Sequence, residues 1–190
     1  MANWQPLDLS GLIDKYQAEH VVVRGYLPWE KPSNEIAKAQ IASARAKGCS
    51  VAMYFWAYHA NDPAETIKEA NAVMADCGVE GIAWLDCETY VADDIIVDLG
   101  PDANWLRAAG EEAKKLGIIV GAYLGLWWLR QYLTDYADFT GWPIWIAQYS
   151  GGPTLDDVIL PDGWNRTMLM GKQYTDEGGV DQDVFLIRQS

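Results

Sequence analysis

Three segments of the chain repeat one order of hydrophobic and polar positions. Each has apolar residues every three or four positions, then a glycine, then an apolar run rich in β-formers. The segments with apolar residues every three or four positions are 33–47, 62–77 and 102–116. The apolar runs that follow them are 51–57, 81–85 and 118–124. This spacing predicts amphipathic helices, and Gly48, Gly78 and Gly117 stand where a left-handed C-cap would end each one. The pattern therefore predicts helices that alternate with strands.

The flanking segments extend this alternation at one end and change it at the other. A weaker helical pattern over 8–17 precedes a β-rich run at 20–24. After a short aromatic helix at 126–136, three strands follow with little helix between, at 143–148, 167–174 and 182–187. Alternating strands and helices predict an α/β fold with a parallel sheet and outer helices, here with a β-rich C-terminal part. The seven strands are one fewer than the eight of a closed (β/α) barrel.

Composition narrows the possible functions. A chain of 190 residues, half of them hydrophobic, suits a single domain over 1–190. Its formal charge of −13 argues against binding of phosphate backbones, so no nucleic acid partner is expected. Met1 to Asp8 hold no basic region followed by an apolar run, and no stretch is long enough to cross a bilayer. We expect a chain made in the cytoplasm without a signal peptide, and no membrane partner.

The metal-binding and nucleophilic residue types are scarce. Cys49, Cys77 and Cys87 are odd in number, lack metal-ligand spacing and lie within or beside apolar patterns, which predicts buried free thiols. His20 and His59 are the two histidines, too few for a histidine-rich metal site. No metal and no cofactor are expected.

Two carboxylates stand close together at the end of one predicted strand. Asp86 and Glu88 follow the apolar run 81–85, and their spacing of two points both side chains to the same face while Cys87 points away. Glycosidases use such a pair: a protonated carboxyl donates to the leaving oxygen and an ionised one stabilises positive charge on the sugar. Two solvated acids that end a strand are the alternative.

Acids, amides and aromatic residues also end the other predicted strands, where (β/α) barrels carry their chemistry. The chain has ten tryptophans and ten tyrosines, whose ring faces and polar edges suit a sugar-binding groove. An aromatic core near the barrel top is the alternative for each. The further strand-end residues are Tyr54, Trp56, Tyr123, Gln148, Tyr149, Gln173, Tyr174 and Asp181.

Four stretches of the chain resemble the family 25 glycoside hydrolases, the Chalaropsis-type lysozymes of bacteriophage and bacterial wall lysins. Residues 52–57 are similar to the family's strand with a Gly-x-Tyr-x-Phe pattern, and residues 84–88 to its Asp-x-Glu strand. Residues 144–149 are similar to its Leu-Trp-Ile-Ala-Gln-Tyr strand. Residues 173–183 are similar to its ending, Gln-Tyr-Thr and then Val-Asp-x-Asn. The order and spacing agree over nearly the whole chain.

The resemblance implies a TIM-barrel-like (β/α) barrel that cleaves the β-1,4 bond between N-acetylmuramic acid and N-acetylglucosamine in peptidoglycan. It makes Glu88 the general acid. Asp86 would stabilise the oxocarbenium-like charge or orient a neighbouring N-acetyl group, and Asp181 would support the pair across the barrel mouth. The sugar cleft would be lined by Tyr54, Trp56, Tyr123, Gln148, Tyr149, Gln173 and Tyr174. The expected partner is the glycan strand of peptidoglycan, and a phage-derived chain would act at the cell wall.

The chain departs from the family pattern in three places. Asp183 stands where the family has Asn, and Lys172 where it has Trp. The family's first strand ends in a further active-site aspartate, which would fall just before residue 1, and this explains the count of seven strands. Two alternatives to an active lysozyme follow: a catalytically impaired glycan-binding or structural module, and an open barrel that self-associates through its strand edges.

Overall fold

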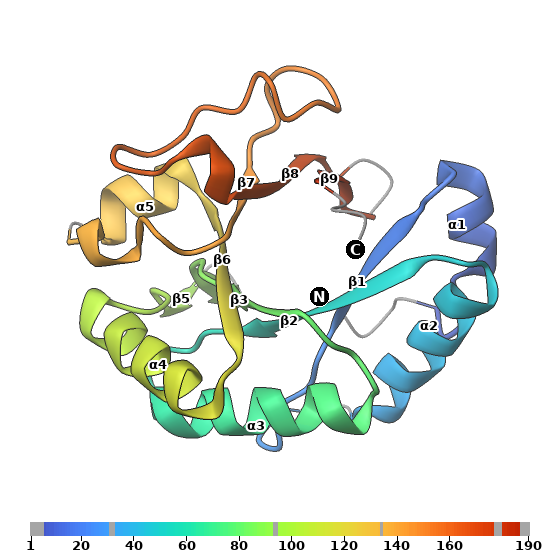
Figure 1. Ribbon diagram of the computed structural model, residues 1–190, viewed down its shortest axis with the longest axis horizontal. Helices are drawn as coiled ribbons and strands as arrows, with labels where there is room; N and C mark the ends of the chain where they lie inside the picture. The colour runs from blue at the N-terminus through green and yellow to red at the C-terminus, as the bar shows by residue number, and fades with distance from the viewer. Residues whose placement is uncertain (1–5, 31–32, 93–94, 134, 177–179, 187–190) are drawn as a thin grey trace.

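The computed structural model describes residues 6–30, 33–92, 95–133, 135–176 and 180–186. Its centre is a seven-stranded sheet that curves into a nearly closed barrel, with the helices outside it (Figure 1). The order across the sheet is β1-β2-β3-β6-β7-β8-β9. The strands are β1 (His20–Arg24), β2 (Ser50–Trp56), β3 (Ile82–Asp86), β6 (Ile119–Gly125), β7 (Ile144–Ala147), β8 (Leu169–Thr175) and β9 (Gln182–Phe185). The α/β prediction and the seven strands are confirmed.

Strands β1 to β8 of this sheet pair in parallel, whereas β9 runs antiparallel to β8. A parallel neighbour needs a crossover of a dozen or more residues. The segment between Thr175 and Gln182 is too short for a crossover, so β9 turns back along β8. The sequence predicted the β-rich C-terminal part but not this reversal.

Within the described residues five α-helices cover the sheet, and two of them, α3 (Pro63–Asp76) and α4 (Ala103–Leu116), begin with an aspartate side-chain cap. The carboxylate of Asp62 accepts from Glu65 N at 2.9 Å, beside a proline at the start of the helix. Gly117 ends another helix with φ 69°, a conformation that glycine adopts without strain. The other helices are α1 (Ser10–Tyr16), α2 (Glu35–Ala46) and α5 (Leu126–Tyr132). Among the described residues, no helix is long and apolar enough to cross a membrane.

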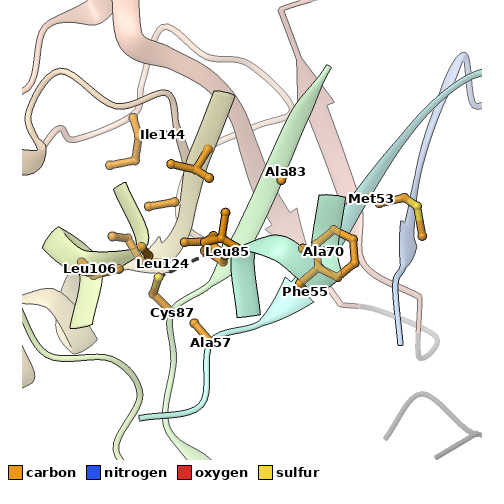
Figure 2. Packing of buried hydrophobic residues seen from close by; sticks show 14 of the residues in the cluster. Met53, Phe55, Ala57, Ala70, Ala83, Leu85, Cys87, Leu106, Leu124 and Ile144 are labelled. Atoms are coloured by element: carbon orange, nitrogen blue, oxygen red, sulfur yellow. Dashed lines mark hydrogen bonds between the residues drawn. The ribbon is translucent and has the colours of Figure 1, made fainter. Parts of the chain in front are cut away.

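Alternation along β3 sends its side chains to two different environments. Leu85 and Cys87 pack in the layer between sheet and helices, close to Leu106 of α4 and Leu124 of β6 (Figure 2). Cys49, Cys77 and Cys87 are all buried and free, as predicted. Trp84 and Asp86 point the opposite way, into the barrel.

Aromatic rings from four strands fill the barrel interior. The ring centroid of Trp145 lies 4.5 Å from that of Tyr123, 5.2 Å from that of Phe185 and 5.9 Å from that of Trp84. Gly121 makes room for this packing, since a Cβ atom there would stand 2.6 Å from the Trp84 ring. The interior below the acid pair is therefore a packed core.

Strands β1 and β9 are the two ends of the sheet. A cavity of about 400 Å³ lies along this seam, lined by residues of both strands and of α1. The rings of His20 and Phe185 face each other across it, with centroids 4.9 Å apart. Tyr54, Asp181 and Asp183 also line it, so the cavity adjoins the side chains at the barrel mouth.

A small antiparallel hairpin, β4 (Tyr90–Ala92) and β5 (Ile95–Asp98), follows the acid pair. The side chains of Ile95, Ile96 and Val97 are exposed, at 67%, 52% and 60%. Asp98 ends the hairpin with a local turn, in which its carboxylate accepts from Gly100 N at 2.7 Å. The sequence did not predict this hairpin.

Candidate active site

The acid pair lies on a backbone that its neighbours hold from both sides. At the end of β3, Ala57 N donates to the carbonyl oxygen of Asp86 at 3.1 Å, and Cys87 N donates to the carbonyl oxygen of Tyr123 at 2.9 Å. The side chain of Asp86 is buried, whereas Glu88 is half-buried at the barrel mouth. The backbone that carries both carboxyl groups is therefore held at the carboxyl ends of the parallel strands.

Burial raises the pKa of both carboxyl groups. Desolvation raises the pKa of Asp86 well above its usual range, and the neighbouring Glu88 raises it further. Desolvation, and then the charge of Asp181, raises the pKa of Glu88 to about 7. A carboxyl group with a pKa near the working pH can act as a general acid. The pair can therefore keep a proton at neutral pH and deliver it to a bound substrate.

Asp181 reaches the same site from the segment before β9. Its side chain is exposed at the mouth, yet desolvation by the surrounding groups and the charge of Asp176 raise its pKa. The amide of Gln173 donates to Asp181 and accepts from the Tyr123 hydroxyl at 2.5 Å. The Tyr149 hydroxyl donates to the same amide oxygen at 3.4 Å. Gln173, itself buried, thus links an acid to two tyrosines.

An aromatic wall stands beside the acid pair. In the sheet register, Trp56 on β2 pairs with Asp86, so the two side chains point to the same side. The Trp56 ring lies 5.8 Å from that of Tyr58 and 5.6 Å from that of Tyr90. Tyr54 is on the same face of β2, and burial followed by the charge of Asp86 raises its hydroxyl pKa. These rings give the mouth a surface that can cover the C–H face of a sugar.

Two of the predicted cleft residues use their polar atoms elsewhere. The Gln148 amide nitrogen donates to the carbonyl oxygen of Asp157 at 3.0 Å, and its oxygen accepts from Ile159 N at 2.8 Å, so this side chain holds its own loop. Tyr174 lines the cavity between β1 and β9, and its hydroxyl donates to the Gln182 amide oxygen at 3.2 Å. The remaining predicted residues come together at the mouth.

The sequence of the chain decides its family. Residues 30–183 match the sequence model described as Glycosyl hydrolases family 25. The chain belongs to glycosyl hydrolase family 25. It is 28% identical over 153 residues to Probable GH family 25 lysozyme 3 of Dictyostelium discoideum, in an alignment that covers 76% of this chain and 31% of that protein. The chain thus spans less than a third of that relative's length.

Solved structures share the family 25 fold. The autolysin LytC from Streptococcus pneumoniae matches with a TM-score of 0.69 and 18% identity, over 94% of this chain and 43% of that one. A family 25 glycosyl hydrolase from Bacillus anthracis matches with a TM-score of 0.62 and 14% identity, over 95% of this chain and 83% of that one. At these identities the likeness establishes the fold.

Both internal departures from the family 25 pattern have partners in the structure. The Lys172 side chain is fully buried, and its ammonium donates to the carbonyl oxygens of Ser150 at 3.0 Å and Gly152 at 2.9 Å and to the Asp157 carboxylate at 2.6 Å. Asp183 accepts from Trp145 Nε1 at 2.9 Å, a bond that an asparagine oxygen would also make. Burial raises the pKa of Asp183 to about 7.

The sequence analysis missed a cation at the mouth. Arg24, the last residue of β1, forms an ion pair with Glu30 in the segment that follows. Its guanidinium carbon lies 5.8 Å from the Trp56 ring centroid and 5.1 Å from that of Tyr26. The rule that strand ends carry chemistry would have found Arg24, because 20–24 was a predicted strand. Among the described residues, no group of three or more His, Cys, Asp or Glu is arranged to hold a metal ion.

Proposed function

We propose that this chain is a peptidoglycan hydrolase of the lysozyme type, an N-acetylmuramidase that cleaves the β-1,4 bond between N-acetylmuramic acid and N-acetylglucosamine. The observation that carries the proposal is the pair Asp86 and Glu88, which lie together at the barrel mouth, with burial raising the pKa of Glu88 to about 7. Family membership supports it. LytC, which shares the fold, has been solved in complex with a synthetic peptidoglycan ligand.

In this proposal Glu88 protonates the glycosidic oxygen as the bond to the anomeric carbon of N-acetylmuramic acid breaks. Asp86, ionised, stabilises the oxocarbenium-like charge or orients the neighbouring N-acetyl group, and Asp181 supports the pair from across the mouth. An enzyme carboxylate or the acetamido oxygen can attack first, since both routes use clustered acids. Water finally supplies the hydroxyl on the anomeric carbon and returns a proton to Glu88.

The cleft of this enzyme would bind sugars with rings and amides. Trp56 and Tyr54 would cover C–H faces beside the acids, while Gln173, Tyr123 and Tyr149 would offer hydrogen bonds at the opposite wall. This scheme needs no cofactor, because acid catalysis and water complete the reaction. The partner is the glycan strand, with neither nucleic acid nor membrane involved.

The rate should fall as the pH rises through about 7. Glu88 must be protonated to act, and its pKa is raised to about 7, so the protonated fraction decreases about tenfold for each unit above that value. The measurement is kcat/KM for soluble glycan fragments between pH 5 and pH 9, because kcat/KM reports ionisations of the free enzyme. A constant kcat/KM over this range would mean that Glu88 is not the acid.

Gly100 lies close against the backbone of Glu88, and its replacement by alanine should impair turnover. Its φ is +82°, and a Cβ atom would stand 2.7 Å from the carbonyl oxygen of Glu88 and 2.9 Å from the Trp128 ring. A shift of about 1 Å in a catalytic group can cost about a hundredfold in rate, so a loss of that order in kcat is expected. The matched control is Gly141→Ala, where nothing lies within 4 Å. Equal rates for both variants would contradict the prediction.

The test of the proposed function is the release of reducing ends from purified peptidoglycan, followed over time with the chain at several concentrations. A linear rise proportional to protein supports the proposal. Absence of new reducing ends from a folded chain would refute it. The same proposal includes a phage origin, as an endolysin or a tail-associated hydrolase. Such a chain would be made in the cytoplasm and would reach the wall by host lysis or on the virion.

The second candidate is a glycan-binding module without turnover. The cavity of about 400 Å³ between β1 and β9 favours it, since Tyr54, Trp145 and Asp181 give it the aromatic and polar lining that suits a sugar. Such a module would co-sediment with insoluble peptidoglycan and release no reducing ends. Self-association through the edges of β1 and β9 would instead appear as a sedimentation coefficient that rises with protein concentration.

A further inference from the structure

The proposed roles of the two acids conflict with the burial of Asp86. Its exposed fraction is 4%, and its Oδ1 atom is buried with no hydrogen-bond partner among the described residues. Removal from water opposes the charge that Asp86 needs in order to stabilise a cation on the sugar. The neighbouring acids add to this opposition. The titratable groups that act on Asp86 from the barrel side come from strands on both sides of it. They are Tyr54 on β2, Glu88 after β3, Tyr123 on β6, Asp181 before β9, and Arg24 and Glu30 from β1 and the segment after it.

Arg24 is the cation in this set, and the sheet places it on the correct face. The register pairs Arg24 on β1 with Tyr54 on β2, and Trp56 on β2 with Asp86 on β3. Partners in neighbouring parallel strands point to the same side, so Arg24, Tyr54 and Asp86 all face the barrel mouth. The positive charge of Arg24 lowers the pKa of Asp86, against the effect of burial.

The guanidinium of Arg24 is held rigidly and away from water. Glu30 forms an ion pair with it and accepts from Leu27 N at 2.8 Å through its second oxygen, which fixes the partner. The exposed fractions of the Arg24 and Glu30 side chains are 15% and 5%. The rings of Tyr26 and Trp56 flank the guanidinium, and its Nε atom has no partner among the described residues. A charge shielded in this way is screened little by salt.

We propose that Arg24 is a positioning residue whose buried charge opposes the protonation of Asp86, and so favours the state in which Asp86 is ionised and Glu88 carries the proton. Glu30 orients the guanidinium and also moderates its charge. The catalytic meaning of this state rests on the proposed function, but the effect of Arg24 on Asp86 can be measured without substrate.

The experiment is a titration of the side-chain carboxyl carbons by ¹³C NMR in the full chain labelled at Asp and Glu, with the Asp86 signal assigned by Asp86→Asn. In Arg24→Gln, the titration midpoint of Asp86 should rise by about one pH unit or more. At a pH below both midpoints, this shift makes the ionised fraction of Asp86 about tenfold smaller than in the parent. Arg24→Lys retains the charge, so its Asp86 midpoint should lie between those of Arg24→Gln and the parent. Arg107→Gln, which removes an exposed cation paired with Asp135 and Asp138 on the outer surface, should not move the midpoint.

Glu30→Gln is an independent test, in which the expected shift of the Asp86 midpoint has the opposite sign. The charge of Glu30 raises the pKa of Asp86, so its removal should lower the Asp86 midpoint. An Asp86 midpoint that is the same in Arg24→Gln and in the parent would overturn the proposal. If Arg24→Gln does not fold, an unchanged or higher midpoint in Glu30→Gln overturns it.

Kinetics separate positioning from a merely structural role. With soluble glycan fragments as substrate, Arg24→Gln should move the acid limb of the kcat/KM profile to higher pH by the shift seen in the titration, because both report the free enzyme. A uniform loss at every pH would indicate structural damage and contradict the proposal. If the parent chain releases no reducing ends, the proposed function fails, while the titration still decides the role of Arg24.

Discussion

Replacing Glu88 with glutamine is expected to lower the release of reducing ends from peptidoglycan by roughly 10²- to 10⁴-fold, the usual contribution of a general acid. Glutamine keeps the size of the side chain and can still form hydrogen bonds, but it has no proton to give to the glycosidic oxygen. The half-buried position of Glu88 and its pKa of about 7 are the properties that this substitution removes. The measurement is the initial rate at pH 6, where most of the parent's Glu88 is protonated.

The matched control is Glu111→Gln on α4. The side chain of Glu111 is 69% exposed and pairs with Lys114 on the same helix, which lies outside the barrel (Figure 1). Glu111→Gln removes one carboxylate without touching the acid pair, so the rate of this variant should equal that of the parent. If Glu88→Gln and Glu111→Gln turn over equally fast, Glu88 is not the acid.

Lys172→Ala is expected to lower the free energy of unfolding by about 2–5 kcal/mol, the cost of truncating a long side chain in a packed core. Lys172 is fully buried, and its ammonium holds three oxygens of the segment 150–157 against β8. Without it, a cavity opens and the carbonyl oxygens of Ser150 and Gly152 lose their donor. Urea denaturation followed by tryptophan fluorescence measures the change.

Two further variants separate volume from hydrogen bonding at this position. Lys172→Met fills most of the space and should cost less than Lys172→Ala, since only the polar contacts are lost. Asp157→Asn keeps an acceptor oxygen for the ammonium, on a side chain that is 32% exposed. It should therefore lower the free energy of unfolding least of the three variants. A free energy of unfolding for Lys172→Ala within 0.5 kcal/mol of the parent, the scale of an ordinary surface change, would show that the ammonium contributes little.

Local signals in the sequence were sufficient for the regular part of the fold. Gly117 stops α4 where a left-handed residue is required, and Asp62 begins α3 with a side-chain cap, so both boundaries depend on a few neighbouring residues. The alternation that puts Leu85 and Cys87 outside and Asp86 inside is also local. The acid pair could therefore be found before any tertiary contact was known.

Features that depend on contacts between distant segments could not be predicted in this way. The strand β5 contains three consecutive apolar residues, Ile95, Ile96 and Val97, so it lacks the alternation by which a half-buried strand is recognised. A lysine is normally solvated, and nothing near Lys172 in the sequence indicates that carbonyl oxygens some twenty residues away will surround its ammonium. Gln148 likewise lies at a strand end, where its use within its own loop is decided by tertiary structure.

The identity of the new reducing ends tests the proposed muramidase activity most directly. Purified peptidoglycan would be digested with the chain, reduced with borohydride, hydrolysed in acid and analysed for amino sugar alcohols by mass spectrometry. Cleavage between N-acetylmuramic acid and N-acetylglucosamine leaves muramic acid at the reducing end, so muramitol should accumulate with time in the parent and not in Glu88→Gln. Accumulation of glucosaminitol instead, or of neither alcohol, would contradict it.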